Sequence, residues 1–151
     1  MRNLAARAGI LAVAALWLAL ACVPAAAQQS RTVSGIVISF GIVPAEVALR
    51  ADGHRDSHPT NPPAGSQHLL ITLDEAKTGK RIGDAEVVIE VTDPHGRKEK
   101  MPLLHTQAAG LADYSELFRF GSQGAYSVRV IVTPKPGAKP VEARFTVHHV
   151  I

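Results

Sequence analysis

The spacing of apolar residues in the second half of this chain is the feature that most restricts its fold. In residues 125–133 every second residue from Tyr126 to Val132 is apolar, and the residues between them are mostly polar. A period of two places the apolar side chains on one face of a β-strand, whereas an amphipathic helix has a period of 3.6. Residues 140–149 alternate in the same way. The pattern therefore predicts strands with one buried and one solvated face.

Turn sequences separate the alternating runs. Residues 93–96 read Asp-Pro-His-Gly and residues 121–124 read Gly-Ser-Gln-Gly. Proline fixes its φ angle and glycine accepts a positive one, so both residue types favour turns. We expect strands at residues 31–43, 67–75, 84–92, 98–104, 113–120, 125–133 and 140–149. About seven short strands joined in this way predict an all-β protein, an immunoglobulin-like antiparallel β-sandwich.

The alternation also predicts which residues form the core. The residues that we expect between the two sheets are Val87, Ile89, Val128, Val130, Phe145 and Val147. Tyr126 follows a glycine turn, the position of a tyrosine corner, whose hydroxyl binds the backbone a few residues upstream. A tyrosine that only fills the core fits the same pattern. Residues 97–100 are all charged, as is typical of an edge strand that resists aggregation.

The first residues have the three parts of a secretory signal peptide. Arg2 and Arg7 are basic, residues 8–23 form an apolar run, and residues 25–27 are all alanine. The run of 16 residues is shorter than the ~20 apolar residues that a membrane-spanning helix needs. The pattern predicts a signal helix that is cleaved after Ala27.

Cleavage there divides the chain into the signal peptide and a single β-sandwich domain, residues 28–151, that is periplasmic or secreted and does not span the membrane. The alternative is a lipoprotein signal, in which the chain is lipidated at Cys22. The mature chain would have no cysteine, hence no disulfide and no thiolate ligand. It would carry 14 basic and 13 acidic residues, a net charge of +1. This balance gives no reason to expect a nucleic-acid partner.

Several short motifs resemble bacterial periplasmic domains. Residues 65–73, 74–82 and 84–87 look like the opening of YtkA-like and FixH-like domains, and residues 124–128 resemble their later strand. The resemblance covers roughly residues 33–149 and implies an immunoglobulin-like sandwich.

A more distant resemblance connects the chain with periplasmic proteins associated with bacterial iron transport. It rests on Met101-Pro102-Leu103 and on Asp113-Tyr114, together with the glycine turn before the later strand. Those proteins bind copper or iron through histidine, methionine and carboxylate ligands. In this chain Leu103 stands where they have a methionine ligand, and Asp113 stands where they have a histidine. The resemblance therefore implies the fold and the compartment, and two ligand positions differ.

All seven histidines lie after the signal peptide: His54, His58, His68, His95, His105, His148 and His149. Imidazole is the commonest metal ligand in proteins and suits copper, zinc and iron. The densest group is His54 and His58 with Asp52 and Asp56, in the long proline-containing segment before the second expected strand. His68 begins that strand, on the face that we expect to be solvated unless a loop covers it. We expect a copper or iron site built from these five residues; the alternative is that they are solvated polar side chains.

The sequence contains no motif that indicates catalysis. It has no Gly-x-Ser-x-Gly elbow, no His-Glu-x-x-His pair and no phosphate-binding glycine loop. Met101 fits a core position better than a copper ligand. We therefore expect a non-enzyme and keep two functions open. One is a metal-handling accessory domain in the cell envelope; the other is an interaction module that docks on an envelope or membrane protein complex.

Overall fold

The computed structural model describes residues 28–48, 62–108 and 111–150. The elements within them are β1 (Gln29–Val33), β2 (Ile36–Pro44), α1 (Ala45–Ala48), β3 (Ser66–Glu75), β4 (Glu86–Thr92), β5 (Lys98–Pro102), β6 (Leu104–Ala108), β7 (Leu111–Arg119), β8 (Gly124–Thr133) and β9 (Val141–His149). The expected signal peptide and the alternative at Cys22 lie outside the described residues. No helix in the described part of the chain is long and apolar enough to cross a membrane.

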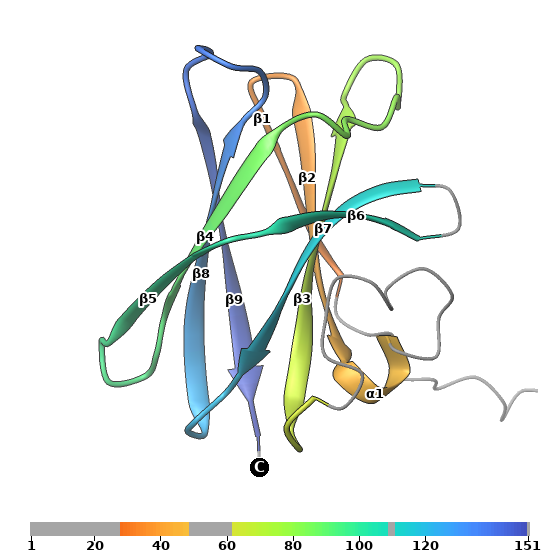
Figure 1. The fold of residues 1–151 in the computed structure, drawn as a ribbon. Coiled ribbons are helices and arrows are strands. Elements are labelled where there is room, and N and C mark those ends of the chain that lie inside the picture. Colours follow the sequence, from red (N-terminus) through yellow and green to blue (C-terminus); the bar gives the residue numbers. More distant parts are fainter. Residues whose placement is uncertain (1–27, 49–61, 109–110, 151) are drawn as a thin grey trace, which may run out of the picture.

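The strands form two antiparallel sheets that pack face to face (Figure 1). One sheet has five strands in the order β1-β2-β3-β7-β6, and the other has four in the order β5-β4-β8-β9. The short helix α1 lies against β2 and β3 of the five-stranded sheet. The predicted all-β, immunoglobulin-like sandwich is confirmed.

The expected number of strands was too small, because two of the expected strands are each two strands. Residues 31–43 contain a hairpin whose turn is Ser34-Gly35, with φ angles of 49° and 79°. Two positive φ angles in a two-residue turn match the twist of the flanking strands. Since a serine rarely adopts a positive φ, Gly35 alone is a weak sign of this turn in the sequence.

The second divided strand is the expected strand at residues 98–104. β5 ends at Pro102 in the four-stranded sheet, and β6 begins at Leu104 in the five-stranded sheet. Leu103 joins them: its side chain is buried, and its amide donates a hydrogen bond to the Val87 carbonyl at 2.9 Å. Alternation shows which face of a strand is apolar but not the sheet to which the strand belongs, so the crossover is absent from the sequence pattern.

The core lies between the sheets and takes large side chains from both. Phe40 of β2 and Phe145 of β9 stack with their ring centroids 5.3 Å apart. Five of the six predicted core residues are buried, and Val147 is partly buried against the core. Tyr126 is buried as well, and its hydroxyl donates to the Ser122 carbonyl at 2.9 Å and accepts from the Ser122 amide at 3.0 Å. The tyrosine corner and its place in the core are both confirmed.

Candidate functional site

His68 is the one residue of the expected metal cluster that the structure describes. It lies in β3 on the outer face of the five-stranded sheet, between Val43 of β2 and Leu117 of β7. The sequence placed it on this face correctly. Of the two alternatives for that face, solvated or covered, the covered one holds, because His68 is completely buried. Its neighbour Leu69 is also completely buried, on the inner face.

The helix α1 contributes to the cover of this outer face. It follows directly on β2 and contacts both β2 and β3, with Ala45 and Ala48 buried. Since Val43 pairs with His68 and α1 begins two residues after Val43, the helix leaves the sheet beside this histidine. The alternation of Leu69, Ile71 and Leu73 along β3 could not have indicated this cover, because the cover comes from chain outside the strand.

The other four residues of the expected cluster, Asp52, His54, Asp56 and His58, lie outside the described residues. Chain connectivity nevertheless limits where their segment is attached. It leaves the described chain at Ala48, at the end of α1, and rejoins it at residue 62, four residues before Ser66 begins β3. Both points of attachment are therefore close in sequence to the strand pairs around His68.

Further polar side chains are buried on the same outer face. Thr106 of β6 donates a hydrogen bond to the Asp113 carboxylate of β7, and its hydroxyl lies 3.4 Å from that of Ser115. All three residues are buried. Sequence reasoning missed this group, because the expected strand ended before Thr106; the only available signal was that Asp113 and Ser115 share one face.

The buried histidine and the buried aspartate do not belong to one site. His68 lies opposite Leu117, and Asp113 is four residues further along β7, about 13 Å at ~3.3 Å per residue. Leu103 is buried in the core, and Met101 packs against the core. No group of three or more His, Cys, Asp or Glu side chains that could hold a metal is found in the described parts of the chain.

The remaining histidines are spread over the molecule. His95 lies in the exposed β4–β5 turn, and His105 is exposed on β6. His148 is exposed, whereas the ring of His149 stacks on Phe120 with centroids 5.0 Å apart. Neighbouring strand residues point to opposite faces, as expected, so the last two histidines do not converge.

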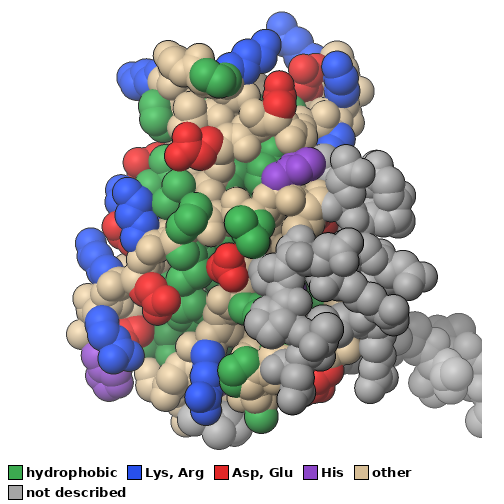
Figure 2. Space-filling view, in the orientation of Figure 1, with side chains coloured by type: hydrophobic (Ala, Val, Ile, Leu, Met, Phe, Trp, Pro, Cys, Tyr) green, Lys and Arg blue, Asp and Glu red, His purple; other side chains and the backbone are tan. Residues whose placement is uncertain are grey.

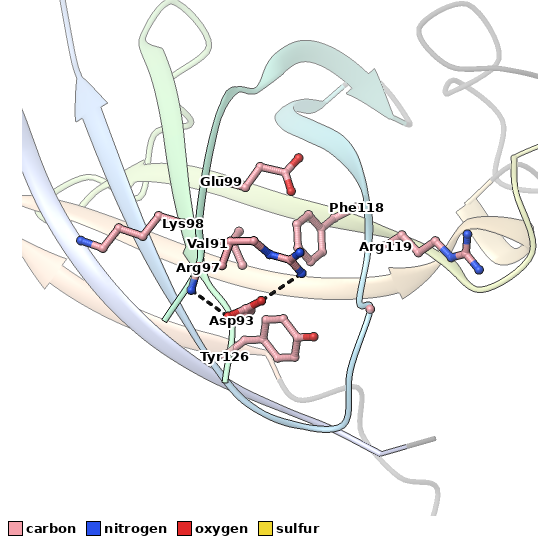
Figure 3. A pocket seen from close by; sticks show the side chains of 9 residues that line it. Val91, Asp93, Arg97, Lys98, Glu99, Phe118, Arg119 and Tyr126 are labelled. Atoms are coloured by element: carbon pink, nitrogen blue, oxygen red, sulfur yellow. Dashed lines mark hydrogen bonds and ion pairs between the residues drawn. The ribbon is translucent and has the colours of Figure 1, made fainter. Parts of the chain in front are cut away.

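A cavity of about 370 Å³ opens between β5 and the end of β7 (Figure 3). Phe118 and Tyr126 form part of its apolar wall, and Asp93 is ion-paired with Arg97 at 3.0 Å. Burial raises the pKa of Asp93, but hydrogen bonds from the Arg97 and His95 amides, together with the Arg97 charge, lower it further than burial raises it. Asp93 is thus an ionised residue that fixes the β4–β5 turn, and it does not have the raised pKa of a general acid.

On the face drawn in Figure 2, neither basic nor acidic side chains form one continuous patch. Lysine and arginine side chains are scattered over this face with aspartate and glutamate among them, and hydrophobic side chains form a band through it (Figure 2). A mixed surface of this kind lacks the continuous basic patch that binds nucleic-acid phosphates.

The sequence matches no protein-family model and no curated protein. Solved structures do resemble the fold. FetP of uropathogenic Escherichia coli superposes with a TM-score of 0.65 at 14% identity, over 81% of this chain and 93% of FetP. A DUF4426 protein of Pseudomonas aeruginosa gives 0.63 at 12% identity, over 81% of this chain and 94% of that protein.

A third similar structure is a copper-bound variant of the P19 protein of Campylobacter jejuni. It gives a TM-score of 0.63 at 11% identity, over 80% of this chain and 94% of P19. At such identities the likeness shows a common fold. The chain is therefore an immunoglobulin-like β-sandwich similar to FetP and P19, which supports the more distant of the two resemblances.

Proposed function

We propose that this protein is exported to the cell envelope and binds copper or iron there, as a non-catalytic metal-handling accessory domain. The ligands would be His68 together with His54, His58, Asp52 and Asp56. One observation carries the proposal: His68 is completely buried on the outer face of the five-stranded sheet, and its pair with Val43 lies close in sequence to both attachment points of the segment that contains the other four residues.

The chemistry of these residues fits a borderline metal ion. Imidazole nitrogen and carboxylate oxygen are ligands that copper and iron accept. Binding requires neutral imidazole, so affinity should fall as the pH drops through ~6.5, the ordinary pKa of histidine. A segment whose two ends are attached to the folded domain loses less entropy on closing around an ion than a free peptide does.

Similar structures add a second line of support. A variant of FetP and the P19 protein are described as copper-bound, and FetP as expressed in the periplasm. Their ligand positions do not carry over, since Leu103 lies in the core and Asp113 bonds to Thr106. Metal binding by this chain would therefore use a different set of residues on the same fold.

The test is calorimetric titration of the purified mature protein with copper, zinc and iron, with thermal melting in parallel. A His54→Ala, His58→Ala double variant should lose tight binding. The matched control is a His95→Ala, His148→Ala double variant, which also removes two histidines but at exposed positions elsewhere. At a hundredfold excess over the dissociation constant, a metal bound only by the folded state should stabilise wild type by ~2.7 kcal/mol.

The role of His68 needs a separate variant, because its substitution could affect folding. His68→Gln keeps a polar side chain, and its melting without metal reports the structural effect alone. The proposal predicts that the metal-dependent rise in melting temperature disappears in this variant. If wild type and the His54/His58 variant melt at the same temperature with and without metal, metal binding by this segment is refuted and the docking module takes its place.

Export can be tested independently of metal binding. The intact mass of the exported protein should correspond to a chain that begins at Gln28, which would establish residues 1–27 as the signal and 28–151 as the mature domain. A diacylglyceryl group on Cys22 would instead show a lipoprotein.

A further inference from the structure

Three loops form one end of the sandwich, called the basic end below: residues 34–35, 76–85 and 134–140 (Figure 1). The Ala76 amide donates a hydrogen bond to the Gly35 carbonyl at 2.8 Å, which joins the second loop to the first. Ser34 and Lys139 line the same groove, so the third loop lies beside the first as well. The three loops therefore present one continuous surface.

Every residue of the basic end is described, and the undescribed segments are joined to the molecule elsewhere. Residues 49–61 lie between α1 and the start of β3, and the loop 76–85 follows the other end of β3. Residue 151 follows the end of β9, and the loop 134–140 precedes its start. Residues 109–110 connect β6 to β7, away from all three loops (Figure 1).

The three loops concentrate positive charge that the net charge of the chain conceals. Together they contain five basic residues and a single acidic one, Asp84. The rest of residues 28–151 contains nine basic and 12 acidic residues. The loops are thus strongly basic, whereas the remainder of the domain is acidic. In Figure 2 this end is seen from the side, at the top, and several lysine or arginine side chains project there.

Most of this charge belongs to lysines of the two longer loops, all of them exposed: Lys77, Lys80, Lys135 and Lys139. Among the described residues none of the four has an ion-pair partner. Backbone hydrogen bonds fix the turns from which they project. The Gly79 amide donates to the Glu75 carbonyl at 2.8 Å, and the Ala138 amide donates to the Lys135 carbonyl at 3.0 Å.

Neighbouring carboxylates offset only part of the charge. Asp74 is ion-paired with Arg81 at 2.6 Å, and Glu75 accepts a hydrogen bond from the Thr78 hydroxyl at 2.7 Å. Asp74 and Glu75 belong to the end of β3 rather than to the loop. Since lysine side chains are longer and start from the loops themselves, they are the charges that a flat surface would meet first.

We propose that the basic end binds an anionic phospholipid surface of the cell envelope, with its lysines against the lipid headgroups. Each lysine near such a surface strengthens binding about fivefold. The attraction falls off within a Debye length, ~8 Å at physiological salt. The acidic remainder of the domain therefore lies too far from the lipid to cancel the attraction of the loops.

The composition of the basic end favours lipid over a protein partner. Protein interfaces have an apolar, often aromatic core and contain less lysine than the rest of the surface. The large hydrophobic side chains that are exposed among the described residues are Val47, Leu104 and Val150. None of them belongs to the basic end, which offers lysines without an apolar anchor.

The experiment is cosedimentation of the purified mature protein with lipid vesicles. A chelator is present throughout, because the proposal does not depend on the metal site. Vesicles of phosphatidylcholine with phosphatidylglycerol should bind the protein, and vesicles of phosphatidylcholine alone should not. Added salt should release the bound protein, since salt screens the charges. A Lys77→Gln, Lys80→Gln variant and a Lys135→Gln, Lys139→Gln variant should each bind about 25-fold more weakly.

The matched control is a Lys98→Gln, Lys100→Gln variant, which removes two exposed lysines from β5. Lys98 pairs with Thr92, six residues and about 20 Å along β4 from the end of the loop 76–85. That distance exceeds the Debye length, so the control should bind almost as tightly as wild type.

Four results would overturn the proposal: no binding to anionic vesicles, equal binding to both kinds of vesicle, binding that the loop variants keep, or an equal loss in the control variant. Retention of the protein on immobilised polyglutamate, without binding to vesicles, would overturn it too. That result would assign the basic end to an acidic protein partner instead of a lipid surface.

Discussion

The two sheets share one core but differ in what covers their outer faces. On the inner side Phe40 from the five-stranded sheet stacks on Phe145 from the four-stranded sheet. On the outer side the four-stranded sheet presents a row of charges, in which Arg129 contacts Glu90 at 3.0 Å and Glu142 at 3.5 Å. The outer face of the five-stranded sheet instead buries polar residues such as His68 and Ser115.

The difference shows what a period of two can and cannot reveal. In β8 of the four-stranded sheet burial alternates strictly, as the sequence alternates, because solvent covers its outer face. In β3 the alternation is broken where His68 and Leu69 are both buried. A sheet that is buried on both faces needs a second layer, and here α1 forms part of it. The candidate metal site belongs to this doubly covered sheet.

Breaking the shared core should have the largest effect. Phe40→Ala and Phe145→Ala should each lower the free energy of unfolding by about 3–5 kcal/mol, as large-to-small changes in a core do. Similar losses on the two sides would confirm that the inner faces are equivalent. Denaturant unfolding measures both, with the exposed Thr146→Ala as the control, which should change stability by less than ~0.5 kcal/mol.

A pair of serine substitutions compares the outer faces directly. Ser115 is completely buried on the five-stranded sheet, and Ser127 is partly exposed on the four-stranded sheet. Ser115→Lys should cost about 2–4 kcal/mol, because it places an ammonium group in a desolvated position. Ser127→Lys should change the free energy of unfolding by less than ~0.5 kcal/mol. Equal effects in denaturant unfolding would show that the two outer faces do not differ in solution.

The fold was readable from the sequence to the extent that it depends on local pattern. Alternation identified the inner faces, and the glycine turn before Tyr126 indicated the tyrosine corner. The pattern could not show that the chain changes sheets at Leu103, because apolar and polar residues alternate in the same way in a strand of either sheet. The hairpin at Ser34 was missed because its first turn residue is one that rarely takes a positive φ.

The candidate site was only partly readable for a related reason. The sequence indicated His68 and the face of β3 on which it lies. Whether that face is covered depends on the tertiary structure rather than on the β3 sequence. The Thr106–Asp113 hydrogen bond joins two strands across a hairpin, and the expected strand ended before Thr106. Periodicity describes one strand at a time, so contacts made between strands stay outside its reach.

The smallest expected effect concerns the charges on the solvated face. Burial raises the pKa of Glu90, but the hydrogen bond from Arg129 and the charges of Arg129 and Lys98 lower it further, so that the net shift is downward. A carboxyl group with a lowered pKa in the folded state stabilises the protein above its unfolded pKa, ~4.3 for glutamate. That contribution is lost as the pH falls through the lower, folded value.

Glu90→Gln should therefore make stability less dependent on pH in the acid range, below about pH 4, where wild type loses the contribution of the carboxylate. Thermal melting of both proteins between neutral and acid pH measures the difference. The control is Glu142→Gln, which removes a more exposed carboxylate from the same arginine at 3.5 Å. It should change the pH dependence less, since solvent screens exposed ion pairs. If Glu90→Gln and Glu142→Gln change the pH dependence of stability equally, solvent screens the Glu90 ion pair as fully as that of Glu142. The outer faces of the two sheets then differ only in whether other parts of the chain cover them.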